Sequence, residues 1–274
     1  MRKHLLALVL CLALTVAAAV PAYAAEAPAD PPIYIDGVLY DHPHTTVVNQ
    51  VTYVSLHAMS KVLLPEAELF WEDGAARVRA EGLEMSARID NLYLYANGRY
   101  LYVPDQVQAG YTPEGDLASA LVPVRTLAKA LGASVSWEDG AVQISSNGEP
   151  LIPGDQFYDQ DALFLLSHII YNESGNQPMT GKIAVGNVLL NRVKHPSFPN
   201  TLYEVIYQPG QFYPESTGAM EKTPNSGSII AAKLCLEGAM VLPNAYWFNG
   251  VGRSCWASRN KECIAVIGGH AFYG

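Results

Sequence analysis

The clearest chemical signal in the sequence is Glu173, an acid at the end of an apolar helix pattern. Leu163, Leu166 and Ile170 form one stripe of a helix predicted over residues 159–171. Glu173 follows Leu166 by seven residues, which returns a helix to the same face. It is either a helix-end glutamate, paired or solvated at the surface, or an acid in a partly apolar cleft. In a cleft, burial would raise the pKa of the carboxyl group, which could then act as a general acid near neutral pH.

Amide and aromatic side chains follow this glutamate and could bind a sugar. After a tight polar turn at 172–176, a second helix is predicted from 181 to 193, and Asn187 and Asn191 form a polar stripe on it. Sugars offer hydroxyl groups to amides and apolar faces to rings. An ordinary exposed helix face is the alternative for the two asparagines, and a place in the core is the alternative for about half of the rings. The predicted substrate-binding residues are Asn176, Asn191, Gln211, Phe212, Tyr213, Asn249, Trp256 and His270.

Further elements must position these groups. The pattern from Thr201 to Glu204 is a capping box that opens a short helix, which gives Glu204 a structural role. Another helix is predicted from residue 225 or 226 to about 240, and strands are predicted at 245–249 and 264–267. The segment from residue 159 to 274 is therefore predicted to be an α+β domain.

The preceding segment, residues 33–147, is strand-rich and repeats itself. Residues 54–63 align with 122–131, and the same tetrapeptide, Trp-Glu-Asp-Gly, follows each copy. Each unit is predicted to be a strand, a short helix and a hairpin that turns at Asp-Gly. Residues 148–158, which are rich in glycine and proline, are predicted to link this duplicated α+β module to the second domain.

Composition limits the class of protein and of partner. The chain has 274 residues, of which 50% are hydrophobic and 16% charged, so it is globular and long enough for two domains. Its net charge of -9 argues against nucleic acid as a partner. The acidic excess lies in the first half: residues 25–150 hold 17 acidic and 7 basic residues, whereas residues 151–274 hold 9 and 8.

The N-terminus predicts export. Residues 1–24 have a basic start, an apolar run and a small-residue cleavage site, the pattern of a secretory signal peptide. A transmembrane anchor is the alternative, but the run is short and lacks basic residues after it. No other apolar stretch is long enough to cross a bilayer, so the mature protein is predicted to have no transmembrane segment.

The cysteines and histidines predict a disulfide and no metal site. Cys255 and Cys263 bracket a short polar loop and are predicted to pair in an oxidising compartment. Cys235 lies in an apolar segment and is predicted to be a buried thiol. The histidines show no ligand spacing, so neither a metal nor another cofactor is predicted.

Two stretches resemble known families. The run "VPVRTLAKALGASVSWE", from Val122 to Glu138, resembles the copper amine oxidase N-terminal-like stalk domains of exported bacterial proteins, a resemblance that implies no copper. The C-terminal domain resembles the SleB and CwlJ family of cell wall hydrolases. The matching stretches are "YNESGNQPMTGKIAVGNVLLNRV" at 171–193, "FPNTLYEVI" at 198–206, "GQF" at 210–212 and "IGGHAFY" at 267–273.

The second resemblance implies a lysozyme-like α+β fold and a lytic transglycosylase that cleaves peptidoglycan between N-acetylmuramic acid and N-acetylglucosamine. The family's proposed catalytic acid falls on Glu173, but many members have a second glutamate where this chain has Asn176. Transglycosylation tolerates this difference, because the C6 hydroxyl of the muramic acid is the nucleophile and one acid serves both proton transfers. The implied substrate is spore cortex or vegetative wall, and the implied location is secreted, wall-associated, or in the spore cortex or coat.

Other functions stay open at this point. The protein could bind the wall without cleaving it, or Cys235 or Cys255 could act with His270 in a cysteine-dependent wall peptidase or amidase. An accessory or inhibitory wall protein is a possible partner of unknown identity. The stalk, being acidic, would be repelled by wall carboxylates, so spacing or protein contact is the expected role.

Overall fold

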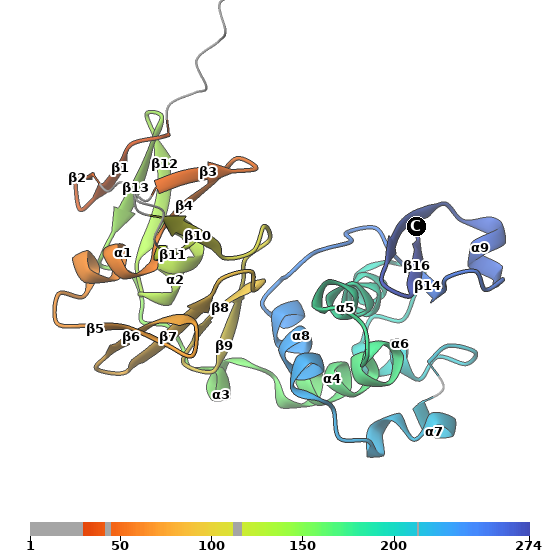
Figure 1. Ribbon diagram of the computed structural model, residues 1–274. Helices are drawn as coiled ribbons and strands as arrows, with labels where there is room; N and C mark the ends of the chain where they lie inside the picture. Colours follow the sequence, from red (N-terminus) through yellow and green to blue (C-terminus); the bar gives the residue numbers. More distant parts are fainter. Residues whose placement is uncertain (1–29, 42–44, 112–116, 213) are drawn as a thin grey trace, which may run out of the picture.

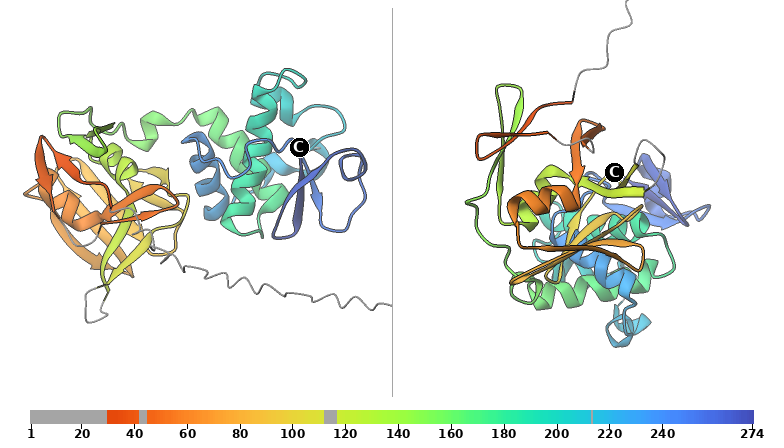
Figure 2. Two further views of the ribbon diagram at one scale, coloured as in Figure 1. Left: turned by 90° about the horizontal axis from the view of Figure 1, so that it is seen from above. Right: turned by 60° about the vertical axis from the view of Figure 1, so that its left-hand side comes forward.

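The computed structural model describes residues 30–41, 45–111, 117–212 and 214–274, which form two lobes side by side (Figures 1 and 2). The N-terminal lobe consists mainly of strands, and the C-terminal lobe consists of helices with one small sheet. The prediction of a mixed α+β protein is confirmed. The predicted signal peptide lies outside the described residues. Within the described ranges, no helix combines the length and apolar character needed to span a bilayer.

Three sheets and two short helices build the N-terminal lobe. The sheets have the strand orders β12-β13-β1-β2, β10-β11-β4-β3 and β5-β6-β7-β8-β9. The elements are β1 (Ile33–Ile35), β2 (Val38–Tyr40), β3 (Thr45–Val48), β4 (Val51–Ser55), α1 (Leu56–Leu63), β5 (Glu68–Glu72), β6 (Ala75–Ala80), β7 (Leu83–Arg88), β8 (Tyr93–Ala96), β9 (Arg99–Tyr102), β10 (Gln108–Tyr111), β11 (Leu117–Pro123), α2 (Val124–Ala130), β12 (Ser134–Glu138) and β13 (Ala141–Ser145).

The two aligned units have the same element order. The first runs β4-α1-β5-β6 and the second β11-α2-β12-β13, and β4 pairs antiparallel with β11. Both hairpins turn where predicted, at Asp73-Gly74 and Asp139-Gly140. All four of these residues have positive φ, as a tight two-residue hairpin turn requires. The apolar residues of both units meet in one core, whose largest members include Tyr53, Leu56, Met59 and Leu127.

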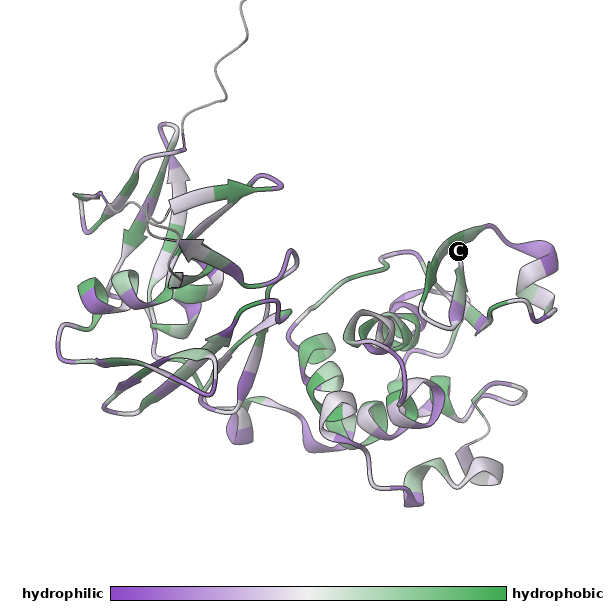
Figure 3. Ribbon diagram, viewed as in Figure 1, coloured by the Kyte–Doolittle hydropathy of each residue, from purple (hydrophilic) through white to green (hydrophobic). Residues whose placement is uncertain are grey.

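The C-terminal lobe packs three long helices together. Its elements are α3 (Gly154–Phe157), α4 (Gln160–Ser174), α5 (Met179–Lys194), α6 (Leu202–Ile206), α7 (Pro214–Thr217), the 3-10 helix η1 (Ala219–Glu221), α8 (Ser226–Leu236), β14 (Trp247–Gly250), α9 (Trp256–Asn260), β15 (Cys263–Ile267) and β16 (His270–Tyr273). The strands form a sheet in the order β14-β16-β15. The core lies among α4, α5 and α8, which are largely apolar in Figure 3.

Local sequence explains where α4 begins and ends. The Asp159 carboxylate accepts from the Ala162 amide (2.8 Å) and caps the helix. At the other end, a Cβ at Gly175 would lie 2.6 Å from the Tyr171 carbonyl oxygen, so the turn after the helix needs glycine. The helix therefore runs to Ser174, beyond the predicted end, and Glu173 belongs to its last turn.

Helix α5 is buried on nearly every side because its neighbours approach closely. Gly186 makes this possible at α8, since a Cβ there would lie 2.5 Å from the Cys235 sulfur. The helix begins at Met179 and ends at Lys194, slightly longer than predicted. The predicted N-cap of α6 is confirmed, since the Thr201 hydroxyl accepts from the Glu204 amide (3.2 Å). The Glu204 carboxylate accepts from the Thr201 hydroxyl (2.8 Å), so the second bond of a capping box, from the Thr201 backbone amide, is replaced by this side-chain contact.

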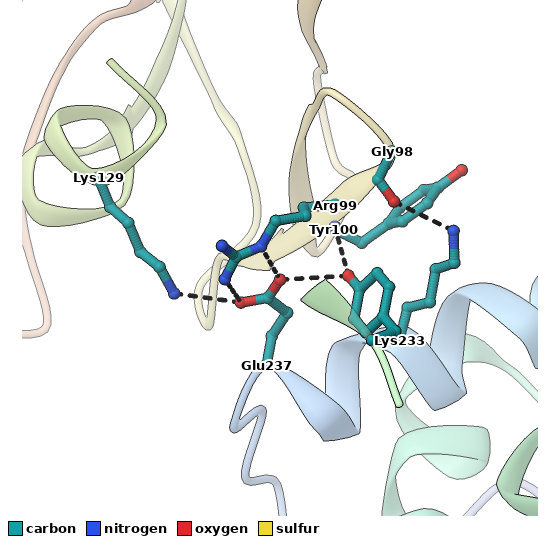
Figure 4. Close-up of polar contacts among 7 residues, drawn as sticks. Gly98, Arg99, Tyr100, Lys129, Lys233 and Glu237 are labelled. Atoms are coloured by element: carbon teal, nitrogen blue, oxygen red, sulfur yellow. Dashed lines mark hydrogen bonds and ion pairs between the residues drawn. The ribbon is translucent and has the colours of Figure 1, made fainter. Parts of the chain in front are cut away.

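The two lobes meet through a buried ionic contact (Figure 4). The Arg99 guanidinium donates to both oxygens of Glu237, at 2.5 and 2.7 Å, and Lys129 reaches the same carboxylate at 3.1 Å. The side chains of Arg99 and Glu237 are only 4% and 1% exposed. The Tyr158 hydroxyl donates to Glu237 and accepts from the Tyr100 amide, both at 3.2 Å.

The predicted linker is part of this interface. Residues 148–158 include the short helix α3, and the Gly154 amide donates to the Asn97 carbonyl (2.8 Å). A Cβ at Gly154 would lie 2.4 Å from the Gly98 carbonyl oxygen, so the segment packs directly on the turn between β8 and β9. From the same hairpin, Tyr93 and Tyr100 pack against the C-terminal core.

Candidate active site

A cleft of about 870 Å³ lies on the C-terminal lobe. Its wall is contributed by the last turns of α4 and α5, residues 210–212 with Thr217, β14 with the loop that follows it, and the starts of α9 and β16. In Figure 1, β14, β16 and α9 lie on the side of the C-terminal lobe away from the N-terminal lobe, while α8 faces that lobe. The lobe interface and the cleft are therefore separate regions of the molecule.

Glu173 lines this cleft, so of the two interpretations that the helix periodicity left open, the structure agrees with an acid in a cleft. Its side chain is half-buried, and burial raises the pKa of the carboxyl group above its ordinary value. A hydrogen bond from Asn172 (3.0 Å) and the charge of Lys222 oppose that rise in pKa. The last turn of a helix is also an unfavourable place for a negative charge. The site therefore favours a carboxyl group that keeps its proton to higher pH than a solvated glutamate.

A second hollow of about 550 Å³ shares Glu173 with the cleft. It is lined by the end of α4, by Asn176 and by two residues from the segment before α8, Lys222 and Asn225. The Asn225 amide donates to the Gly175 carbonyl (3.0 Å), which ties this segment to the end of α4. Glu173 thus borders both hollows, so a ligand that occupies the two together would contact it.

Most of the predicted substrate-binding residues meet at these two hollows. Asn176 lines the second hollow, and the cleft is lined by Gln211, Phe212, Asn249, Trp256 and His270. Two of the amides also bond the protein. Gln211 accepts from Arg192 (2.8 Å), and Asn249 donates to the Arg253 carbonyl (3.3 Å). These contacts hold the amides at the cleft wall.

The aromatic side chains of the cleft differ in exposure. The Trp256 ring is 55% exposed and lies 5.7 Å, between ring centroids, from Trp247. Phe212 is buried and belongs to the core, so it forms the floor of the cleft. Phe248 meets the His270 ring edge-on at 5.3 Å. Trp256 is therefore the ring best placed to stack on a sugar.

His270 has a polar atom with no protein partner. Its Nδ1 is buried and has no hydrogen bond within the part of the chain that the structure describes. Burial lowers the pKa of its imidazole below the ordinary value. A neutral imidazole at the cleft wall can donate from one nitrogen and accept at the other.

The prediction that Asn191 binds substrate is wrong. Its side chain is 5% exposed, and its amide donates to the carbonyls of Leu242 (2.8 Å) and Ala245 (3.0 Å). The companion residue Asn187 is also buried and bonds the Ala239 carbonyl (2.8 Å) and the Val241 amide (2.7 Å). The polar stripe on α5 therefore holds the loop after α8 instead of facing a ligand. Tyr213, another predicted contact, lies outside the described residues.

The predicted disulfide between Cys255 and Cys263 is not formed, and both residues have free thiols. Each sulfur has a local partner instead. The Cys255 sulfur accepts from the Ser258 amide (3.3 Å) and caps α9, while the Cys263 thiol donates to the Ala265 carbonyl (3.7 Å). Cys235 is buried as predicted, and burial raises the pKa of its thiol to about 12, which makes it a poor nucleophile.

Several site residues were not found from sequence. Trp247 and Phe248 line the cleft from β14, and Arg253 lines it from the following loop. Arg192 lies near the end of α5, where it donates to the Tyr246 carbonyl (2.7 Å) and to Gln211. Burial lowers the pKa of its guanidinium to about 10. Only the alternating pattern of the last strands could have indicated the two rings; a basic residue at a helix end is too common to indicate a site.

No metal centre is evident. Among the residues that the structure describes, no group of three or more histidine, cysteine, aspartate or glutamate side chains could hold a metal ion.

Comparisons with known proteins match the C-terminal lobe. Residues 176–273 match a protein family described as Cell Wall Hydrolase, a range that begins just after Glu173. The spore cortex-lytic enzyme of Bacillus cereus is 36% identical over 117 residues, which cover 42% of this chain and 45% of that protein. The spore cortex-lytic enzyme of Oceanobacillus iheyensis is 31% identical over 143 residues, covering 52% of this chain and 49% of the relative. The chain thus spans about half the length of these relatives.

Two solved structures are also similar. They are the catalytic domain of the Bacillus cereus SleB protein and the catalytic domain of the germination-specific lytic transglycosylase SleB from Bacillus anthracis. The identities are 31% and 30%, and both TM-scores are 0.40. Each match covers 43% of this chain, with 92% of the first structure and 97% of the second.

Proposed function

Since residues 176–273 belong to the cell wall hydrolase family, we propose that this protein cleaves the glycan strands of peptidoglycan and that Glu173 is its acid and base. The observation that carries the proposal is the place of Glu173. Glu173 is half-buried, its carboxyl group has a raised pKa, and the residue lines both hollows. A polymer threaded through both hollows would present an internal bond to this one acid.

The proposed reaction is that of a lytic transglycosylase. Protonated Glu173 donates its proton to the glycosidic oxygen between N-acetylmuramic acid and N-acetylglucosamine, and that C–O bond breaks. The resulting carboxylate takes the proton of the muramic acid C6 hydroxyl, whose oxygen forms the new bond to C1. The products are a 1,6-anhydro sugar end and a free hydroxyl on the N-acetylglucosamine. No water is consumed, and Glu173 regains its proton.

The described lining of the two hollows supports this route over hydrolysis. Direct hydrolysis needs a second carboxylate as base or nucleophile. Glu173 is the only acidic side chain among the described residues that line either hollow. Asn176, which lines the second hollow, is an amide and cannot serve as the second carboxylate that hydrolysis would require.

The remaining cleft residues would bind the sugars. Trp256 offers an exposed ring for stacking, and Gln211, Asn249 and His270 offer hydrogen-bonding groups along one wall. Asn176 would contact the sugar on the other side of Glu173. The relatives are named spore cortex-lytic enzymes, which favours spore cortex as the substrate over vegetative wall.

We also propose the location and domain roles. The predicted signal peptide, residues 1–24, would export the chain, and the catalytic domain, residues 159–274, would act on the wall outside the membrane. The N-terminal lobe, residues 33–147, would serve as a stalk-type domain that spaces the catalytic domain or contacts another protein. Its two strand-helix-hairpin units are consistent with a duplicated module.

The experiment is digestion of purified spore cortex and of vegetative sacculi, followed by mass spectrometry of the soluble fragments. We expect the wild type to release fragments with 1,6-anhydro ends and Glu173→Gln to release none. Glu204→Gln is the matched control, because Glu204 bonds Thr201 at the start of α6 and lines neither hollow, so its substitution should leave release unchanged. Release of fragments with reducing ends would show that the protein hydrolyses the glycan strands and would contradict the proposed transglycosylation. Absence of fragments from every variant, with binding retained, would identify a wall-binding protein.

The cysteine-dependent alternative requires one further variant. Cys255 lines the cleft together with His270, whereas Cys235 is buried. Cys255→Ser should keep the release of glycan fragments, and cleaved stem peptides should not appear. Loss of release in this variant, with Glu173→Gln still active, would move the chemistry to the thiol.

A further inference from the structure

Glu173 is connected to a cation through one neighbouring side chain. The Lys222 ammonium donates to the Oδ1 atom of Asn172 at 2.7 Å, and the Nδ2 atom of Asn172 donates to Glu173 Oε1 at 3.0 Å. Lys222 comes from the segment between η1 and α8, fifty residues away along the chain. The contact between these segments does not depend on Lys222 alone, because Asn225 bonds the Gly175 carbonyl in the same region.

The order of donors and acceptors fixes the Asn172 amide. An amide side chain has an oxygen that only accepts and a nitrogen that only donates, whereas an ammonium group only donates. Lys222 therefore requires the Asn172 oxygen on its side, and the NH₂ group must face Glu173. Without Lys222 the amide could turn over and place its oxygen against the carboxylate, which would repel it.

Within the described residues, no other titratable group that lines the two hollows bonds Glu173. From the cleft side, these groups are Arg192, Arg253, His270 and Cys255, and from the second hollow Tyr171. Arg192 is directed to Gln211 and the Tyr246 carbonyl. In the described structure, the bond from Asn172 is the one hydrogen bond given to the Glu173 carboxylate.

We propose that Lys222 is a positioning residue, which acts through Asn172 to orient the Glu173 carboxyl group and to set how readily it releases its proton. This inference rests on the proposed role of Glu173. A donor held against the carboxylate favours the charged form, and burial favours the neutral form. The proposed reaction needs protonated Glu173 first and its carboxylate afterwards. The hydrogen bonds from Lys222 to Asn172 and from Asn172 to Glu173, called the relay below, offset the effect of burial, so that both forms are accessible.

The test compares four variants by two measurements. The first follows the Glu173 carboxyl carbon by NMR against pH, with its signal assigned by loss in Glu173→Gln. The second is the pH profile of fragment release. Lys222→Met and Asn172→Leu remove the relay, Lys222→Arg keeps a donor at the same place, and Lys194→Met is the matched control. Lys194 is an exposed lysine of the same lobe that lines neither hollow next to Glu173.

We expect Lys222→Met and Asn172→Leu to raise the Glu173 pKa, and to move the alkaline limb of the pH profile to higher pH with it. Lys222→Arg and Lys194→Met should leave both unchanged. An unchanged Glu173 pKa in folded Lys222→Met would overturn the inference. The NMR readout needs no turnover, so it decides the relay even if the wild type releases no fragments, a result that would reject the proposed function alone.

Discussion

The Arg99 guanidinium and the Glu237 carboxylate form a two-pronged ion pair that joins the two lobes, with both side chains almost fully buried. Buried charges are costly to desolvate, so each depends on the other for compensation. Arg99 is further covered by the Phe157 ring, whose centroid lies 3.4 Å from its guanidinium carbon. The interface is therefore specific in geometry, and the lobes should behave as one body.

Breaking this pair should destabilise the whole protein. Glu237→Gln leaves Arg99 buried without its counter-charge, and we expect the free energy of unfolding to fall by about 3–5 kcal/mol in urea denaturation. Glu72→Gln is the control, because the Glu72–Arg77 pair is exposed and its loss should cost less than about 1 kcal/mol. The double variant Arg99→Met with Glu237→Met should recover much of the loss. Two separate unfolding transitions in the wild type would contradict a single body.

Glu173 should lower stability at the pH where it ionises. Burial raises its pKa in the folded state above the unfolded value, so the folded state holds the proton more tightly. Stability from this group is present below the unfolded pKa and is lost as pH rises through the folded pKa. Glu173→Gln, which cannot ionise, should therefore be more stable than the wild type at neutral pH, with the gap closing in acid. A constant gap across urea titrations from pH 4 to pH 8 would contradict the raised pKa.

Removing the exposed ring of the cleft should weaken binding and spare the fold. Trp256→Ala is expected to raise KM for glycan strands about 3- to 10-fold, since a stacked ring contributes about 0.5–1.5 kcal/mol beyond its buried area. The melting temperature should change little, because the ring is more than half exposed. Trp256→Phe keeps a ring and should restore most of the affinity. Equal KM in Trp256→Ala and the wild type would place the substrate elsewhere.

Substitution of Asn191 should lower stability and leave substrate binding unchanged, which is the opposite of the effect expected for Trp256. Asn191→Ala leaves two buried carbonyls, those of Leu242 and Ala245, without their donor, and we expect a loss of about 1–3 kcal/mol in the free energy of unfolding. The rate of fragment release per folded molecule should stay close to the wild-type value at a temperature where the variant is folded. A selective rise in KM without loss of stability would return Asn191 to the substrate.

Much of the fold was predictable because its signals are local. The Asp-Gly turns, the Thr201 N-cap and the helix that ends near Glu173 depend on residues only a few positions apart. The periodicity of α4 placed Glu173 on the same face as Leu166. The later segments indicated five further residues of the cleft lining, namely Gln211, Phe212, Asn249, Trp256 and His270.

The errors have a common physical cause. A helix with amides four residues apart has the same pattern whether those amides face solvent or buried carbonyls, and α5 proved to be packed on nearly all sides. Arg99 and Glu237 are 138 residues apart, and Lys222 and Asn172 are fifty apart. Such partners are set by how the lobes and segments come together, which no short pattern encodes. The spacing of Cys255 and Cys263 likewise did not reveal that each sulfur has a hydrogen-bond partner within three residues, the Ser258 amide for Cys255 and the Ala265 carbonyl for Cys263.

The docking of residues 148–158 on the turn between β8 and β9 fixes how the N-terminal lobe holds the C-terminal lobe. A flexible linker would let the C-terminal lobe take up many orientations, over a range that grows with the length of the linker. Because residues 148–158 are docked on the N-terminal lobe, the C-terminal lobe instead keeps one orientation, and the elements of its cleft lie on the side away from the N-terminal lobe. If the N-terminal lobe is attached to the wall or to another protein, the cleft beside Glu173 would face away from that attachment. The orientation of the N-terminal lobe would then decide which glycan strands the cleft can reach.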